Sequence, residues 1–265
     1  HIQKLGINGM MQWTTNGVAA VTAADHQLYP VVVPDAAGGA IVVWEDYRST
    51  ATSGDIYAQR ISGAGQPLWG TNGLLVCGAQ GVQMRPAVAP DGQGGASIVW
   101  EDYRGATADI YAQHVTAAGA LSWATNGVRA ATVNAARYAP TVASAAGGGI
   151  LVAWEENRVG TEFDIHAQYL NASGTAQWGG GGMAVCAVAG FQSQLSGVSD
   201  GNGGMLLVWQ DFRNGGADVH AQKLTTTGVA WTSGGVAVCV ASGAQQWPRP
   251  APDGQGGMID RKSVV

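Results

Sequence analysis

The stretch "ASIVWEDYRGATADIYAQHV" (96–115) contains two short runs rich in apolar and β-branched residues, joined by a polar loop. "PDGQGG" (90–95) comes directly before it, and Asp and Gly in such a segment are typical of a hairpin turn. "PAVAP" (86–90) and "ALSW" (120–123) flank these segments. The sequence therefore predicts four consecutive antiparallel strands, at 86–90, 96–104, 109–115 and 120–123.

This unit is repeated along the chain. Trp44, Trp100, Trp154 and Trp209 stand at the same point of the unit and are 56, 54 and 55 residues apart. A segment resembling "DIYAQH" follows each of them. Four antiparallel strands repeated in series are typical of a β-propeller blade, whereas β-solenoid coils are usually shorter and lack three tight hairpins. We predict an all-β fold, a β-propeller of four-stranded antiparallel blades.

The two ends of the chain contain parts of further units. Residues 1–13 align with 220–231, and residues 248–259 repeat the first half of a blade. We predict a single domain over 1–265. It has complete blades at about 29–73, 85–127, 139–182 and 194–235, and partial blades at 1–17 and 248–259. If the two parts complete one sheet, the propeller closes with five blades and no free edge.

The last residues break the repeat. In register, Lys262 stands where the second and fourth units have tryptophan, although "APDGQGG" (251–257) is intact. "DRKSVV" (260–265) matches one reading frame of a common sequencing adapter. We therefore expect 260–265 to be a non-native tail on a metagenomic gene fragment. In that case the two partial blades need not belong together.

The composition argues against several classes of protein. Charged residues make up 12% and the net charge is −5 without a basic stripe, so nucleic acid is not an expected partner. No apolar run is long enough to cross a membrane as a helix. We expect no cofactor and no metal, because no phosphate loop or His/Cys cluster is visible. Cys77, Cys186 and Cys239 occupy equivalent positions in separate blades, too far apart for disulfides. The oligomeric state stays open.

Side chains that recur in every blade are expected to serve packing, because a single binding or catalytic site needs residues that differ between blades. Period-2 alternation puts Trp44, Asp46 and Arg48 on one face of their strand, with Glu45 on the other. We expect an ion pair within each blade, such as Arg48 with Asp55. The recurring structural set is Trp44, Asp46, Arg48, Asp55, Trp100, Asp102, Arg104, Asp109, Trp154, Arg158, Asp164, Trp209, Asp211, Arg213 and Asp218.

The residues at the start of each blade differ from one another. They read "QLY" (27–29), "QMR" (83–85), "RYA" (137–139), "QSQ" (192–194) and "QQW" (245–247). They precede the innermost strand, on the face that also carries the loops between second and third strands. Tyr, Trp and Arg are enriched in binding hot spots, although such differences are also typical of tolerated loop variation. The hypothetical ligand-binding set, around the mouth of the central channel, is Tyr29, Arg85, Arg137, Tyr138, Gln194, Gln245 and Trp247.

The string "VWEDYR…GDIYAQRISGAGQPLW" (43–69) resembles the repeats of large bacterial secreted and surface β-propeller proteins. The resemblance covers nearly the whole chain. It implies an exported protein, extracellular or on the cell surface, with a binding or scaffolding role.

Two functions of different classes follow. The preferred one is a non-catalytic exported scaffold that is not an enzyme. It binds glycan or protein on the face that carries two kinds of loop: those from strand four to the next strand one, and those from strand two to strand three. The alternative is the propeller portion of a larger exported hydrolase of sialidase or glycosidase type, and an inert spacer is a third possibility. A sialidase-like site needs several channel-facing arginines, and Arg85 and Arg137 are too few to support one.

Overall fold

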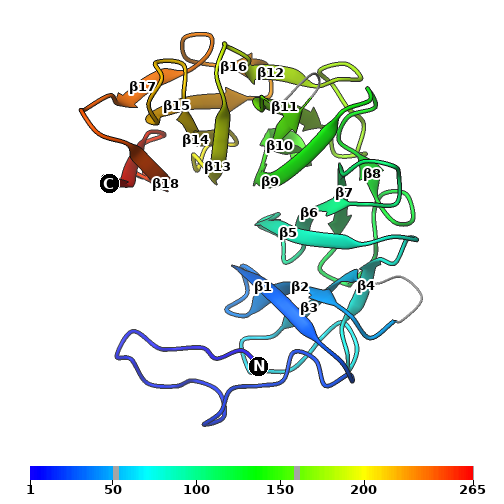
Figure 1. The fold of residues 1–265 in the computed structure, drawn as a ribbon. Coiled ribbons are helices and arrows are strands. Elements are labelled where there is room, and N and C mark those ends of the chain that lie inside the picture. Colours follow the sequence, from blue (N-terminus) through cyan, green and yellow to red (C-terminus); the bar gives the residue numbers. More distant parts are fainter. Residues whose placement is uncertain (50–53, 158–161, 265) are drawn as a thin grey trace.

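The computed structural model describes residues 1–49, 54–157 and 162–264. Its strands form successive antiparallel sheets that stand around a common centre, as the blades of a propeller do (Figure 1). The sheets follow one another in chain order along an arc. An N-terminal segment, residues 1–24, lies at one end of the arc, and β18 and β19 lie at the other.

Four sheets are complete blades. Three of them pair their strands in sequence order from the centre outwards, and in the fourth the last two strands both pair with the third. The first blade consists of β1 (Gln27–Pro34), β2 (Ala40–Asp46), β3 (Asp55–Ile61) and β4 (Leu74–Cys77). The second consists of β5 (Gln83–Pro90), β6 (Ala96–Asp102), β7 (Asp109–Val115) and β8 (Val128–Arg129). The third consists of β9 (Ala136–Ser144), β10 (Ile150–Asn157), β11 (Asp164–Leu170) and β12 (Met183–Cys186), with a 3₁₀ turn, η1 (Ala146–Gly148). The fourth consists of β13 (Gln192–Ser199), β14 (Met205–Asp211), β15 (Asp218–Thr225), β16 (Gly228–Val229) and β17 (Val236–Cys239). A last sheet pairs β18 (Gln245–Pro252) with β19 (Met258–Val264).

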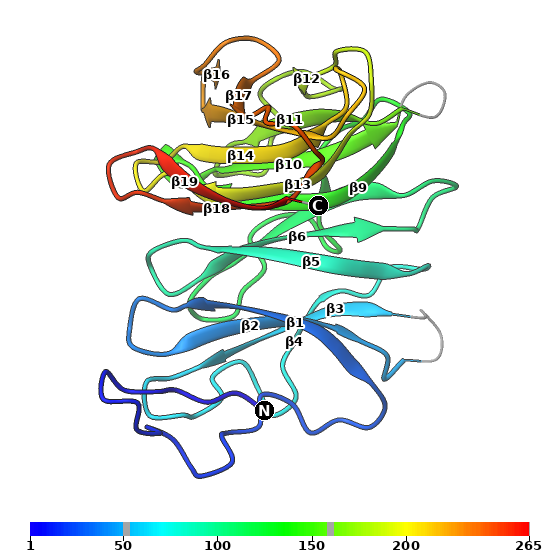
Figure 2. The ribbon, with the colours of Figure 1, turned by 60° about the vertical axis from the view of Figure 1, so that its left-hand side comes forward.

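The hydrophobic core lies between consecutive blades. One apolar cluster joins Leu151 of the third blade to Trp209 of the fourth, and similar clusters join the first blade to the second and the second to the third. Figure 2 shows these sheets stacked face to face. The second strands are therefore covered on both faces, which explains their unbroken apolar sequence.

The fourth strand lies later in the chain than the sequence analysis predicts. In the second blade Leu121, within the predicted strand 120–123, makes only one bridge, to Val115, and the sheet is completed by β8. The segment after the β7 turn can pair only with the end of β7. The chain must then turn again at Gly127 before it can pair with the first half of β7. Gly127 has φ +83°, and a Cβ there would lie 2.6 Å from Cη2 of Trp100.

The two partial blades do not complete one sheet, so the predicted five-bladed closure is not observed. The N-terminal segment packs on the first blade, where Trp13 Nε1 donates to the carbonyl of Gly63 at 3.1 Å. Trp69 makes the same bond to Ala117 of the next blade. The last sheet instead packs on the fourth blade, and within the described ranges no strand pairing joins it to residues 1–24 (Figure 1). Residues 260–264 of the predicted non-native tail form the end of β19.

Candidate functional site

The recurring Trp, Asp and Arg side chains make one hydrogen-bonded unit inside a blade. Trp44 Nε1 donates to Asp46 Oδ2 at 2.7 Å, and Arg48 Nε donates to Asp46 Oδ1 at 2.7 Å. Burial alone would raise the pKa of Asp46, but the hydrogen bonds from Arg48 and Trp44 hold that pKa below its ordinary value. The same unit recurs as Trp100, Asp102 and Arg104 and as Trp209, Asp211 and Arg213.

Arg48 therefore pairs with Asp46, and the predicted pair with Asp55 is wrong. Asp46 and Arg48 are two residues apart on one face of the chain, whereas Asp55 lies on the neighbouring strand, opposite Asp46. Asp55, Asp109, Asp164 and Asp218 each begin the third strand of a blade. Arg158 lies outside the described residues.

Two residues of the hypothetical ligand-binding set are buried inside the protein. Arg137 is completely buried, and its guanidinium donates to Glu156 Oε2 at 2.7 Å and to Asp109 Oδ1 at 2.8 Å. Gln245 is also completely buried, and its amide donates to the carbonyl of Gly243 at 2.7 Å. Their place in the blade-start triplets predicted exposure, but the first residue of the last four triplets is completely buried.

The third residue of each triplet lies in a β-bulge. In the first blade Tyr29 and Pro30 together stand opposite Trp44. A residue other than glycine with positive φ is uncommon, and such strain gathers at functional sites. All five bulge residues have it: Tyr29 (50°), Arg85 (51°), Ala139 (50°), Gln194 (55°) and Trp247 (58°). The bulge thus re-aims a side chain that differs in all five triplets.

These bulge residues differ in how far they reach into solvent. Tyr29 is 67% exposed and Trp247 49% exposed, and the Arg85 side chain is exposed as well. Gln194 and Tyr138 are half-buried. A cavity of about 240 Å³ lies between the first and second blades, lined by Tyr29, Glu45, Met84 and Arg85.

A glutamate of one blade holds the bulge of the next. Glu45 Oε1 accepts from the backbone N–H of Arg85 at 2.7 Å, and Glu101 Oε1 accepts from that of Ala139 at 2.8 Å. Glu155 Oε1 accepts from the N–H of Leu195, beside the bulge, at 3.0 Å. Because such carboxylates recur, the sequence predicts a structural role for them. The bonds to the bulge region of the following blade are of that kind.

The three glutamates are not equivalent. Tyr47 and Tyr103 donate their hydroxyls to Glu45 and Glu101 at 2.9 and 3.0 Å. Asn157 occupies the matching position in the third blade, and among the described residues no hydroxyl donates to Glu155. Burial raises the pKa of Glu155, and the nearby charge of Glu101 adds to the effect, although backbone N–H groups of Leu195 and Gln194 oppose it.

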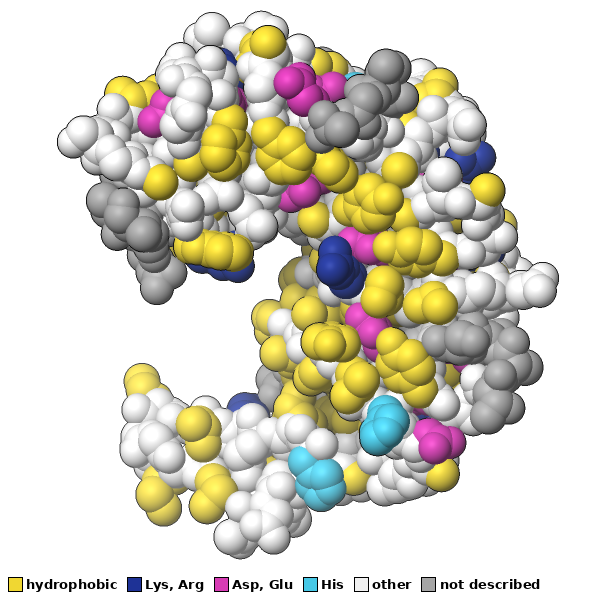
Figure 3. All heavy atoms as spheres, in the orientation of Figure 1, with side chains coloured by type: hydrophobic (Ala, Val, Ile, Leu, Met, Phe, Trp, Pro, Cys, Tyr) yellow, Lys and Arg dark blue, Asp and Glu magenta, His cyan; other side chains and the backbone are white. Residues whose placement is uncertain are grey.

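We call this region the channel mouth: Tyr29, Arg85, Tyr138, Gln194 and Trp247 with Glu45, Glu101 and Glu155. Arg85 Nη1 donates to Glu101 Oε1 at 3.2 Å. An aromatic row begins beside it, with the rings of Tyr138 and Phe163 5.7 Å apart and those of Phe163 and Phe191 5.1 Å apart. Figure 3 shows hydrophobic side chains interleaved with separate acidic and basic ones beside the central hollow.

Two further features bear on the chemistry. Within the described ranges, no group of three His, Cys, Asp or Glu side chains could hold a metal ion, and the three cysteines are free thiols. No helix in the described part of the chain is long and apolar enough to cross a membrane.

Neither a protein-family model nor a curated protein matches the chain. Among solved structures, a protein of unknown function from Dyadobacter fermentans is 10% identical, with a TM-score of 0.55, covering 89% of this chain and 74% of that one. The Penicillium chrysogenum α-L-arabinanase complexed with arabinobiose is 12% identical, with a TM-score of 0.52, covering 90% and 67%. A Hadza microbial sialidase is 12% identical, with a TM-score of 0.47, and the chain spans 45% of its length.

These likenesses establish the fold, a propeller-like all-β architecture shared with glycoside hydrolases. They also contradict the prediction of a non-catalytic scaffold that is not an enzyme, because the arabinanase with this architecture is an enzyme. The alternative of a glycosidase-like propeller fits the finding better. The physical reason is that a fold does not determine function, so the recurrence of residues from blade to blade could not exclude an enzyme.

Proposed function

We propose that this chain is the propeller portion of a glycoside hydrolase and that a glycan binds across the channel mouth. The shared architecture supports this, since the arabinanase of similar fold is complexed with arabinobiose, a neutral sugar. An exported location, extracellular or on the cell surface, belongs to the same proposal and rests on the resemblance to bacterial secreted repeat proteins. A glycan is the partner that we propose.

The aromatic and polar lining of the channel mouth suits a sugar. Tyr29 and Trp247 expose large rings, which offer flat apolar area to the C–H faces of a sugar at little entropic cost. Arg85 has guanidinium N–H groups beyond the one that contacts Glu101. Glycan hydroxyls pair well with such donors and with the carboxylates beside them.

The observation that carries the proposal is the difference between Glu155 and its two counterparts. Glycosidases need a carboxyl group that holds a proton near neutral pH, and a raised pKa supplies one. Glu155 has a raised pKa and lacks the tyrosine hydroxyl that binds Glu45 and Glu101. Backbone N–H groups of Leu195 and Gln194 bond to this carboxyl group, but no side-chain hydroxyl among the described residues does.

In the proposed reaction Glu155 gives its proton to the leaving oxygen of the glycosidic bond. The bond between the anomeric carbon and that oxygen breaks, and water adds a hydroxyl to the carbon and returns a proton. Positive charge develops on the sugar ring in the transition state. Glu101 is buried and bonded to Arg85 and to the N–H of Ala139, so its role is to position these groups and not to contact the sugar.

The test is an assay of the purified chain against neutral and acidic oligosaccharides, including arabino-oligosaccharides and sialosides, with release of reducing ends as the readout. Glu155→Gln should lower kcat by about a hundredfold or more, because loss of general acid catalysis costs roughly 10²–10⁴. Tyr29→Ala combined with Trp247→Ala should instead weaken glycan binding. Asp91→Asn, in the β5–β6 turn where Asp91 Oδ1 accepts from backbone N–H groups, is the control.

Absence of hydrolysis across the panel would contradict the proposal. So would a Glu155→Gln protein that keeps its full rate. A loss of equal size in Glu45→Gln would show that the third blade is not special.

A further inference from the structure

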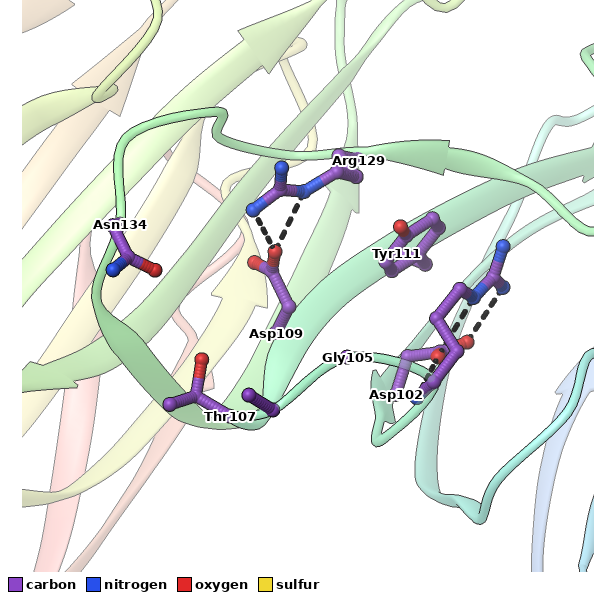
Figure 4. Close-up of a pocket in the computed structure, with 9 residues that line it drawn as sticks. Asp102, Gly105, Thr107, Asp109, Tyr111, Arg129 and Asn134 are labelled. Atoms are coloured by element: carbon purple, nitrogen blue, oxygen red, sulfur yellow. Dashed lines mark hydrogen bonds and ion pairs between the residues drawn. The ribbon is translucent and has the colours of Figure 1, made fainter.

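A second cavity opens on the outer part of the second blade. Its volume is about 250 Å³, and its walls are the loop between β6 and β7 and the segment that leaves β8 (Figure 4). Sites for drug-sized ligands measure roughly 300–1,000 Å³. This cavity is therefore suited to a single small ring. The channel-mouth cavity has a separate set of lining residues.

The charged side chains of this cavity are paired within its own wall. Asp109 accepts from Nε of Arg129 at 2.6 Å, and Asp102 accepts from Nε of Arg104 at 2.8 Å. Asp109 also contacts the buried Arg137, which is balanced by Glu156. Three acidic and three basic groups thus neutralise one another, and the cavity offers no net charge to an ionic ligand.

The neutral groups of the wall are uncommitted. The hydroxyls of Thr107 and Tyr111 and the side-chain amide of Asn134 have no hydrogen-bond partner among the residues that the structure describes. Figure 4 shows Thr107 and Asn134 on one side of the Asp109–Arg129 pair and Tyr111 on the other. Hydroxyl and amide groups can each donate and accept, so the three together match a ligand rich in hydroxyls.

The second blade alone has an arginine at the position of Arg129. Arg129 stands opposite Tyr111, and the matching partners in the other blades are Leu75, Ala184 and Ala237. Asp109 is already held by Arg137, so its burial does not require Arg129. Arg129 extends the polar wall outward instead, and its guanidinium stays partly exposed.

We propose that this cavity is a second carbohydrate site, which binds one neutral sugar ring through Thr107, Tyr111, Asn134 and the Asp109–Arg129 pair. The preference for a neutral ring follows from the paired charges. A sugar offers several adjacent hydroxyls, and each can meet one of the uncommitted groups. The site does not require hydrolysis at the channel mouth, so either proposal can fail without the other.

The test uses ¹⁵N-labelled full chain titrated with the methyl glycosides of glucose, galactose, xylose and arabinose, and with sodium glucuronate. At least one neutral glycoside should give saturable amide shifts at residues 105–109 and 129–134. Thr107→Val combined with Asn134→Ala removes two hydrogen bonds and should weaken binding about tenfold or more. Both side chains are exposed and unpaired, so the fold is not at risk.

Asn202→Ala, an exposed asparagine in the β13–β14 turn, is the matched control and should bind as the wild type does. Trp247→Ala should leave these shifts unchanged, which separates the cavity from the channel mouth. The proposal is overturned if none of the neutral glycosides shifts these amides, if the double variant binds equally well, or if glucuronate binds more tightly than every neutral sugar.

Discussion

Glu45 and Glu155 occupy the same position in the first and third blades, yet their surroundings differ. Glu45 accepts a hydroxyl from Tyr47, whereas Asn157 stands in that place beside Glu155. Both carboxylates still hold the bulge region of the following blade. The comparison teaches that a repeated residue can keep its structural bond in three blades while its surroundings change in one of them.

The third blade also differs from its neighbours in one buried side chain. Arg137 replaces the glutamine that the second and fourth blades have as Gln83 and Gln192, and it binds Glu156 and Asp109 while completely buried. A buried charge that loses its partner is costly, whereas a lost neutral hydrogen bond costs less. Replacing this residue by leucine should therefore lower the free energy of unfolding more in the third blade, which has arginine, than in a blade that has glutamine.

The largest expected effect comes from Arg137→Leu. It leaves Glu156 and Asp109 buried without this partner and should lower the free energy of unfolding by about 3 kcal/mol or more. Gln192→Leu in the fourth blade loses two hydrogen bonds to backbone carbonyls and should cost about 1–2 kcal/mol. Urea denaturation of both variants measures this, and equal losses would break the comparison.

A smaller effect is expected from Tyr103→Phe. The change removes the hydroxyl from Glu101 and makes its surroundings like those of Glu155, at a cost of about 1 kcal/mol in the free energy of unfolding. Burial and Glu101 raise the pKa of Tyr103 to about 12, so the phenol stays protonated and donating across the neutral range. Tyr169→Phe is the control, because its hydroxyl has no partner among the described residues. A similar cost in both variants would contradict the role of the hydroxyl.

The smallest expected effect is a change in the pH dependence of stability. The pKa of Glu155 is raised in the folded protein, so its contribution is fully present below the unfolded pKa, near 4.3, and is lost as pH rises through the folded pKa. Asn157→Tyr should supply the missing hydroxyl, favour the carboxylate and bring the pKa of Glu155 down. The fall in the free energy of unfolding between pH 4 and pH 8 should then be smaller than in wild type.

Asn157→Phe is the matched control for this change, because it adds the ring without the hydroxyl. Denaturation curves recorded across the pH range compare all three proteins. The hydroxyl has no such role if the tyrosine and phenylalanine variants show the same pH dependence.

Much of the architecture could be predicted from the repeats. The spacing of Trp44, Trp100, Trp154 and Trp209 predicts the series of sheets. In the second blade the predicted second and third strands agree with β6 and β7 to within two residues, whereas β5 begins three residues earlier than predicted. The fourth strand could not be placed from the sequence. Two segments, 120–123 and β8, both lie beside β7, and only the tertiary structure shows that β8 completes the sheet. The variable triplets did not show which residue of each faces outward, because that depends on the bulge.

The sequence by itself determined the local features of the fold. The strand periodicity, the turn glycines and the recurring Trp–Asp–Arg unit each depend on residues that are close together in the chain. The tertiary structure decided what depends on distant segments meeting. It buried Arg137 and Gln245, and it held Arg85 and Ala139 in strained bulges against glutamates about forty residues away. The reason is geometric. Successive blades are about 55 residues apart in the chain, but they pack against one another, so residues of different repeats come into contact.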